Sequence, residues 1–326
     1  YGLAILQSGS GAEHQGRCAT VWYGRMEGSH PHKDRLNLGI FAKGYAVNPD
    51  LGYPEFTGMW PKRHGWTSHT VSHNTVLVND RKQSPNWSGR TDLFSGGTLA
   101  QIAIIDGGPP VYEGVTTYRR AVALVDVGSD DSYVVDAFWV RGGRNHRMIN
   151  NGASRDLAHH GLNLTRQPTG TFAGPEVPYA EFYDDALEDG YTGSGFMYLR
   201  DVQRGQATAA TAWADWDIVD KDGTIPEGRD PHLRLYMLSP VDEVAVAIGE
   251  PPHHRYHEDY FPYVIRSRLG DGLETQFLSV LEPYERTPFL STSRALPIEE
   301  NATGGFVAAV EVALADGRRD VVIIAE

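Results

Sequence analysis

Apolar residues in this chain recur in short runs that alternate with polar positions or are rich in β-branched side chains, and helical periodicity is scarce. Clusters of Gly, Asp, Asn and Pro separate the runs, as at 79–80, 107–110, 128–131, 142–143, 270–272 and 316–317. Many short strands with turn residues between them predict an all-β fold, a large antiparallel β-sandwich with few short helices. The predicted strands cover 75–78, 99–105, 121–127, 132–140, 233–238, 243–248, 263–268, 275–281 and 305–312.

Residues 153–201 break this pattern and are rich in Gly and Pro. We interpret them as a long loop, with one short helix near residues 184–187; a linker between two domains is the alternative. The first six and the last seven residues resemble internal strands, and the start lacks the features of a signal peptide. We therefore expect a fragment, or a processed C-terminal portion, of a larger protein.

Charge and cysteine content narrow the classes of function. The chain has 326 residues and a formal net charge of −13, which disfavours general nucleic-acid binding because phosphate contacts need a basic face. It has no long apolar run of the kind that spans a membrane. The single cysteine, Cys18, excludes a cysteine-rich zinc site. A local group of bases still allows an anionic substrate: Lys33, Arg35, Lys62, Arg63 and His64.

The main candidate for chemistry is a set of histidines and acids in the first quarter of the chain. His30 and His32 are two apart, so on a strand they would share one face. A hairpin that turns at Lys43-Gly44 would return Asp50 beside His32, and His73 begins the next apolar run. Two imidazoles and a carboxylate form a normal zinc ligand set, completed by water.

Asp34 competes with Asp50 as the carboxylate ligand. The combination of His32, Asp34 and His73 also matches the facial triad of iron-dependent oxygenases, although His-x-Asp is a common pattern. The spacing alone does not decide between zinc and iron, nor between metal binding and a purely structural role for the histidines.

The sequence resembles the C-terminal β-sandwich domain of heparinase II/III-like polysaccharide lyases. The residues that carry the resemblance are 28–38, 49–54, 72–78, 118–120, 132–138, 142–146 and 277–284. The resemblance implies that residues 1–326 are one such sandwich, and that His30 is catalytic. It further implies a Zn²⁺ of structural role held by His32, Asp50 and His73, and a secreted or periplasmic protein.

In that family a helical toroid normally precedes the sandwich and supplies a catalytic tyrosine, together with an Asn or His that neutralises the uronate carboxylate. Nothing in this chain matches the toroid. We therefore expect the toroid as a partner within the same protein, and little or no lyase activity from this chain alone.

A uronate lyase must neutralise the carboxylate, remove the neighbouring proton and protonate the leaving oxygen. His30 can serve as base or acid, and Tyr53 stands near the predicted cleft. The candidate substrate-binding residues are bases for the carboxylate, aromatics for the sugar rings and a histidine beside the cleft. They are Arg35, Lys62 and Arg63; Trp60 and Trp66; and His146.

The leading hypothesis is therefore β-elimination on an acidic polysaccharide or oligosaccharide, with heparan, chondroitin and alginate all possible. Two alternatives remain open at this point. One is a non-catalytic carbohydrate-binding or assembly module with a structural metal. The other is an iron-dependent jelly-roll oxygenase that uses His32, Asp34 and His73.

Overall fold

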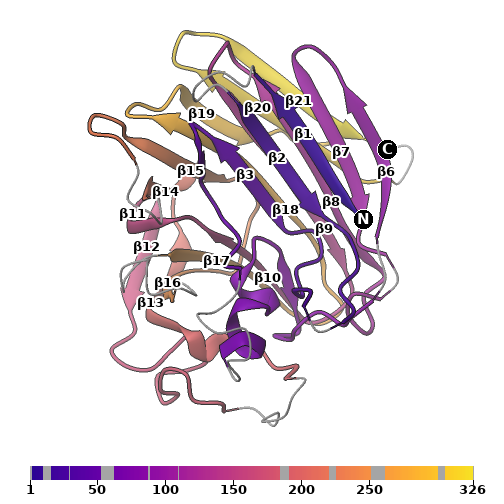
Figure 1. Cartoon of the computed structure of the whole chain (residues 1–326), viewed down its shortest axis with the longest axis vertical. Coiled ribbons are helices and arrows are strands. Elements are labelled where there is room, and N and C mark those ends of the chain that lie inside the picture. The colour runs from indigo at the N-terminus through magenta and orange to yellow at the C-terminus, as the bar shows by residue number, and fades with distance from the viewer. Residues whose placement is uncertain are drawn as a thin grey trace.

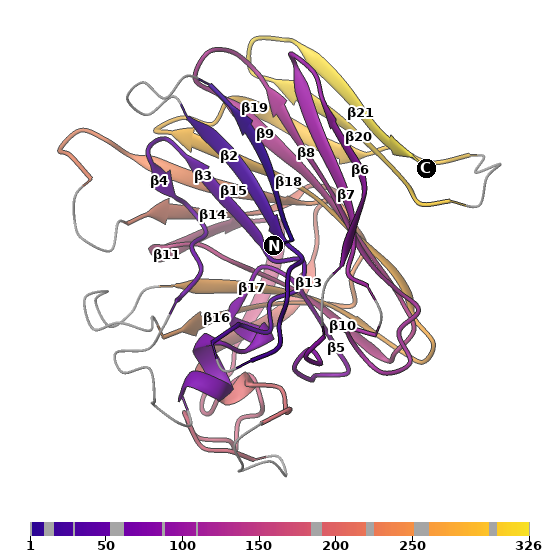
Figure 2. The same ribbon diagram turned by 45° about the vertical axis from the view of Figure 1, so that its right-hand side comes forward.

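The computed structural model describes residues 2–9, 16–28, 30–52, 62–86, 89–108, 110–183, 191–219, 225–250, 261–299 and 305–325. They form four antiparallel sheets (Figures 1 and 2). Helical structure in these ranges is confined to three short segments, the π-helical turn η1 (Arg63–Thr67) and the 3₁₀ turns η2 (Thr70–Ser72) and η3 (Phe196–Tyr198). None of them is long and apolar enough to cross a membrane. The predicted fold class, all-β and antiparallel with few short helices, is confirmed.

The largest sheet has eight strands in the order β11-β14-β15-β18-β9-β8-β7-β6. Their bounds are β6 Arg90–Gly96, β7 Ala100–Asp106, β8 Thr117–Asp126, β9 Ser132–Arg141, β11 Ser154–His160, β14 Ala212–Ile218, β15 Pro231–Met237 and β18 Glu274–Glu285. β8 and β9 are buried on both faces, which explains the apolar runs at 121–125 and 133–140, the second interrupted by the buried Asp136. The large sheet is thus the central layer of the molecule.

Smaller sheets cover the two faces of this central layer. One face meets a four-stranded sheet, β1 (Leu3–Ser8), β2 (Arg17–Trp22), β3 (Leu38–Ala42) and β4 (Tyr45–Ala46), and a six-stranded sheet in the order β12-β13-β16-β17-β10-β5. The latter comprises β5 Val76–Val78, β10 Asn145–Asn151, β12 Leu162–Arg166, β13 Leu199–Ala207, β16 Glu243–Gly249 and β17 Pro262–Leu269. The opposite face carries β19 (Leu290–Ala295), β20 (Val307–Leu314) and β21 (Arg319–Ala325).

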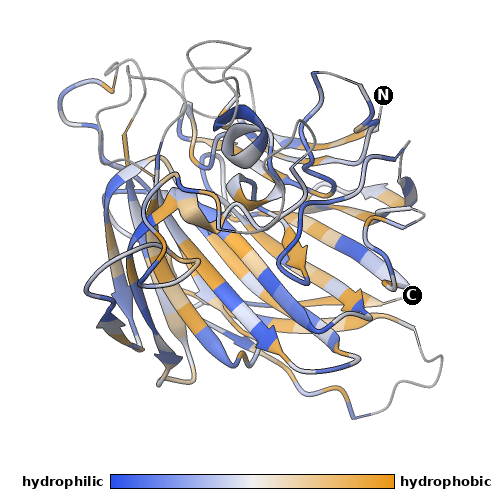
Figure 3. Ribbon diagram, turned by 90° about the horizontal axis from the view of Figure 1, so that it is seen from below, coloured by the Kyte–Doolittle hydropathy of each residue, from blue (hydrophilic) through white to orange (hydrophobic). Residues whose placement is uncertain are grey.

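Side chains alternate along the strands of the central layer, so that each face of this layer packs into a different hydrophobic core. Along β9, Val134, Phe138 and Val140 join the core under the four- and six-stranded sheets, whereas Val135 and Trp139 join the core under β19–β21. Figure 3 shows the resulting apolar stretches along the strands. A third core lies on the outer face of the six-stranded sheet, where η1, η2 and η3 pack.

The prediction of a long loop over residues 153–201 is wrong for the first third of this range. Residues 154–160 and 162–166 form β11 and β12, which are edge strands of two different sheets. Their mostly exposed, polar side chains hide the strand pattern. The helix predicted near residues 184–187 lies outside the described residues.

Candidate metal centre and active site

Three segments from different parts of the fold meet beside η2: the loop before β3, the loop after β4, and the residue that follows η2. The predicted hairpin is present, since β3 pairs with β4 across a turn at Lys43 and Gly44. Both turn residues have a positive φ, 58° and 93°, as the tightest hairpin turn requires. This hairpin returns the chain so that Asp50 lies against His32.

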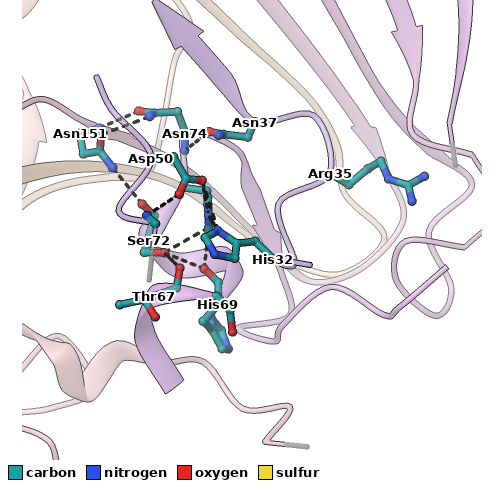
Figure 4. A network of polar contacts seen from close by, with 12 residues as sticks. His32, Arg35, Asn37, Asp50, Thr67, His69, Ser72, Asn74 and Asn151 are labelled. Atoms are coloured by element: carbon teal, nitrogen blue, oxygen red, sulfur yellow. Dashed lines mark hydrogen bonds and ion pairs between the residues drawn. The ribbon is translucent and has the colours of Figure 1, made fainter. Parts of the chain in front are cut away.

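His32, Asp50 and His73 lie together in the structure. His32 Nδ1 lies 3.3 Å from Asp50 Oδ2 and 3.0 Å from His73 Nε2, and His73 Nε2 lies 3.0 Å from the same carboxylate oxygen. Figure 4 shows Asp50 and His32 turned toward each other within a polar network. Ligands of a tetrahedral Zn²⁺ with bonds of about 2.0–2.1 Å lie roughly 3.3 Å apart. The three atoms therefore fit a small divalent cation.

Asp34 is the fourth member of this cluster, because ligand atoms of His32, Asp34, Asp50 and His73 all lie within 4.8 Å of one another. The Asp34 carboxyl is buried, and its Oδ1 makes no hydrogen bond. Burial raises the pKa of this carboxyl, with the neighbouring histidines opposing the rise. A buried carboxylate oxygen without a donor is costly unless a cation compensates it, so Asp34 supports the same conclusion.

Hydrogen bonds from outside the cluster orient its ligands. His73 Nδ1 donates to the carbonyl oxygen of His69 at 2.7 Å, which leaves Nε2 facing the cluster. The backbone N–H of Gly52 donates to Asp50 Oδ1 at 2.6 Å, so that Oδ2 faces the histidines. His69 is itself buried, with Nδ1 accepting from Val71 N and Nε2 donating to the Gly193 carbonyl oxygen.

The electrostatics of the cluster couple its acids to its bases. Partial loss of solvent around the Asp50 carboxylate acts to raise its pKa, but His73 and His32 outweigh this effect and hold that pKa well below its usual value. For His73, burial acts to lower the pKa, and the Asp50 carboxylate overcomes this and raises it. Negative charge is therefore concentrated where the two imidazoles present their nitrogen atoms.

A buried ion pair ties two of the ligand-bearing segments to the central sheet. Arg120 on β8 makes a two-pronged contact with Asp136 on β9, at 2.7 and 2.8 Å, and neither side chain is exposed. Arg120 Nη1 also donates to the carbonyl oxygens of Leu36 and Asn74, both at 2.6 Å. These carbonyls lie two residues after Asp34 and one residue after His73, so the ion pair holds both segments in place.

The structure corrects the prediction that His30 and His32 lie together at the start of a strand. Residues 30–34 form a loop, and the first strand after them begins at Leu38. His30 is exposed, whereas the His32 side chain is only 14% exposed and turns into the cluster. The loop thus leaves His30 at the surface and turns His32 into the cluster with Asp34, Asp50 and His73, which we call the metal group for its ligand types.

Three predicted substrate-binding residues lie in the interior of the folded chain. Arg35 is fully buried, donates to the carbonyl oxygens of Gly107 and Gly24, and points away from the metal group in Figure 4. Trp66 is a core residue whose Nε1 donates to the carbonyl oxygen of Glu250.

His146 is the third. It is buried, with Nδ1 at 2.8 Å from Thr275 Oγ1 and Nε2 at 2.7 Å from the Gly142 carbonyl oxygen. A sugar could reach none of these side chains without disrupting the core.

The remaining predicted residues have mixed positions. Lys62 forms an ion pair with Glu250 at 2.5 Å, and Arg63 lines a cavity of about 930 Å³. Tyr53 and Trp60 lie outside the described residues.

Sequence reasoning missed His69 and Arg120. His69 stands four residues before His73, a spacing that could have suggested a supporting role.

Comparisons with known proteins agree with this architecture. Residues 1–146 match the family model described as Heparinase II/III-like, C-terminal. The heparan sulfate lyase HepC from Pedobacter heparinus is similar in structure, with a TM-score of 0.56, 12% identity, and coverage of 99% of this chain and 41% of that one.

A heparinase III gene product is similar too, with a TM-score of 0.57, 13% identity, and coverage of 100% of this chain and 41% of that one. At such identities the likeness shows the fold alone, and the chain spans about 41% of the length of these structures. A search of curated protein sequences found no match. The first 146 residues thus match the heparinase II/III-like C-terminal model, and the whole chain shares the β-sandwich fold of these structures.

Proposed function

We propose that this chain is the β-sandwich part of a polysaccharide lyase that cleaves a uronic-acid-containing glycan by β-elimination. The observation that supports this most is the convergence of His32, Asp50 and His73 within a heparinase-like sandwich, on the same loop as the exposed His30. A secreted or periplasmic location belongs to the same proposal, because acidic polysaccharides of this kind lie outside the cytoplasm.

We assign Zn²⁺ to His32, Asp50 and His73, with Asp34 as a further carboxylate in reach. The ion would supply positive charge that joins the loop before β3, the loop after β4 and the residue after η2 into one rigid wall. Its role in this proposal is structural, because His73 and Asp34 are buried and only Asp50 in the cluster is exposed.

His30 is the chain's own candidate for proton transfer, since imidazole can take or release a proton near neutral pH. His30 is exposed, and the loop that carries it also carries His32, which belongs to the metal group. The remaining groups, a tyrosine and a residue that neutralises the uronate carboxylate, would come from an N-terminal helical toroid of the same protein.

The test uses the full-length protein with heparan, chondroitin and alginate as separate substrates, followed by the ultraviolet absorbance of the unsaturated uronate product. His30→Ala should lower kcat by about 10²–10⁴-fold and leave the zinc content unchanged. His159→Ala, which changes an exposed histidine on β11, is the matched control and should leave kcat unchanged.

Wild-type turnover in the His30→Ala variant would contradict the catalytic assignment. Binding of these glycans without any turnover would instead support a non-catalytic module. Bound iron together with oxygen uptake would favour the oxygenase that the triad of His32, Asp34 and His73 allows.

A further inference from the structure

A second group of possible metal ligands lies where β14 ends and β15 begins. Asp217 on β14 is the cross-strand partner of His232 on β15, and Asp230 precedes His232 by two residues. Ligand atoms of these three residues, which we call the second cluster, all lie within 4.8 Å of one another. His232 Nε2 and Asp230 Oδ1 are 3.3 Å apart, which matches two ligands of a tetrahedral Zn²⁺.

The second cluster lies apart from the metal group. Trp216 and Leu233, the strand neighbours of Asp217 and His232, point into the core under the four- and six-stranded sheets. Because side chains alternate along a strand, Asp217 and His232 point to the opposite face of the central layer. A ligand at the second cluster would therefore be bound independently of the metal group.

Groups outside the second cluster orient the His232 ring. Its Nδ1 donates to Asp215 Oδ1 at 2.9 Å, and the ring stacks on Tyr284 with centroids 4.8 Å apart and planes 7° from parallel. Asp215 is only 5% exposed and also accepts from Arg234 Nε and Tyr284 Oη, both at 2.7 Å. This arrangement turns Nε2 toward the cluster. A carboxylate behind the imidazole is the usual support of a metal-binding histidine.

The charges at the second cluster favour a cation. Asp215 is paired with Arg234, whereas Asp217 and Asp230 present their carboxylates to one another. Burial raises the pKa of Asp217, and the neighbouring carboxylates of Asp230, Asp156 and Asp215 act in the same direction, against the effect of His232. A divalent cation among these groups would relieve the repulsion between the carboxylates.

The backbone at Asp230 is fixed by contacts of its own. Its N–H donates to Glu285 Oε1 at 3.0 Å, and the preceding Arg229 donates to both Glu285 oxygens at 2.7 and 2.8 Å. Arg229 also donates to the carbonyl oxygen of Lys43, in the turn of the β3–β4 hairpin, at 2.8 Å. The ligand-bearing segment is thus in place before an ion binds, which lowers the ordering cost of binding.

We propose that Asp217, Asp230 and His232 form a second Zn²⁺ site. One imidazole with two carboxylates suits a first-row divalent ion, whereas Ca²⁺ and Mg²⁺ prefer oxygen ligands alone. Water would complete the coordination. Because both aspartates are exposed, the ion would exchange readily with added zinc. It would join the end of β14 to the start of β15, and this inference does not depend on the lyase assignment.

The experiment is a calorimetric titration of the 326-residue chain with zinc chloride near neutral pH, in the His32→Ala background. That background removes a ligand of the metal group and isolates the second cluster. Saturable binding of one ion per chain is expected. Adding Asp217→Asn should weaken this binding at least roughly tenfold, since it replaces an anionic ligand by a neutral amide of the same size.

Asp271→Asn is the matched control, because it removes one exposed carboxylate between β17 and β18 and should leave zinc binding unchanged. Equal weakening by Asp217→Asn and Asp271→Asn would overturn the site, since net charge alone would then matter. Absence of saturable binding would also overturn it, and would assign the contact between His232 and Asp230 to an ion pair with a protonated imidazole.

A second measurement avoids the His32→Ala background. After equilibrium dialysis against zinc, the otherwise wild-type chain carrying Asp217→Asn should hold one ion fewer per chain than wild type, with an unchanged circular dichroism spectrum. Equal zinc content in these two proteins would contradict the proposal. The difference between them does not depend on whether the metal group is loaded.

Discussion

His73 donates a 2.7 Å hydrogen bond from Nδ1 to the carbonyl oxygen of His69, one turn earlier in the chain. This contact selects the tautomer in which Nε2 carries a lone pair, and Nε2 is the atom that meets Asp50 and His32. The ligand geometry is therefore set by backbone structure at η2, before any ion binds.

The first prediction separates the two histidines of the His-Pro-His segment. His32→Ala should lose the bound zinc, because it removes one of the three converging ligand atoms, while His30→Ala should retain it. Metal analysis of purified proteins at neutral pH gives the answer. Equal zinc content in His32→Ala and wild type would rule out the site as assigned.

The second prediction concerns the pH dependence of metal loading. The Asp50 carboxylate raises the pKa of His73 against the effect of burial, so the proton persists on His73 to higher pH than on an ordinary histidine. Protons compete with the metal for the same nitrogen, and zinc affinity should therefore fall as the pH falls from about 8 to 5. Competition with a chelator across this range measures the trend; affinity that is independent of pH would argue against histidine ligation.

The third prediction tests the buried ion pair of Arg120 and Asp136. Asp136→Ala leaves the Arg120 guanidinium charged and without its carboxylate, which should lower the free energy of unfolding by about 3–5 kcal/mol. It should also weaken zinc binding, because Arg120 holds the carbonyl oxygens of Leu36 and Asn74. Urea titration and metal analysis report the two effects.

The control for this variant is Asp271→Ala, which breaks the exposed pair between Arg144 and Asp271. It should change the free energy of unfolding by at most about 1 kcal/mol. A similar loss of the free energy of unfolding in both variants would mean that burial of the pair of Arg120 and Asp136 does not increase the cost of breaking it.

The fourth prediction lies far from the metal group, at Glu282 on β18. Burial raises the pKa of Glu282 to about 7, although its carboxylate accepts from the backbone N–H groups of Phe289 and Leu290 and from the Tyr236 hydroxyl. The folded state then keeps a proton that the unfolded chain releases. Stability contributed by this group is present below the unfolded pKa and is lost as the pH rises toward about 7.

Glu282→Gln should remove that part of the pH dependence, since the amide oxygen can still accept from the same N–H groups. Denaturant unfolding of both proteins between about pH 5 and 8 measures the slopes. An unchanged slope in the variant would assign the pH dependence to other groups.

Local pattern was enough to predict most strands and one turn. β8 and β9 follow apolar runs because they are buried on both faces, and β7 is buried over residues 103–105. The Lys43-Gly44 pair forms the turn with both residues at positive φ. β11 and β12 were missed because edge strands with exposed, polar side chains lack that signal.

The candidate site was likewise predictable only in part from the sequence. Residue types and spacing suggested His32 and His73 with either Asp34 or Asp50, and the family resemblance chose Asp50. Their convergence is consistent with that choice, and the ion itself remains a prediction.

By itself, the sequence determined the sandwich class and the hairpin, because these depend on side-chain alternation and on neighbours along the chain, while the choice among the candidate ligands came from the family resemblance. Only the tertiary structure decided which polar side chains are buried. Arg35 and His146 look like ordinary cleft residues in the sequence, yet distant backbone carbonyls satisfy them in the core. Burial of a charge depends on partners brought from elsewhere in the fold, and no local pattern encodes them.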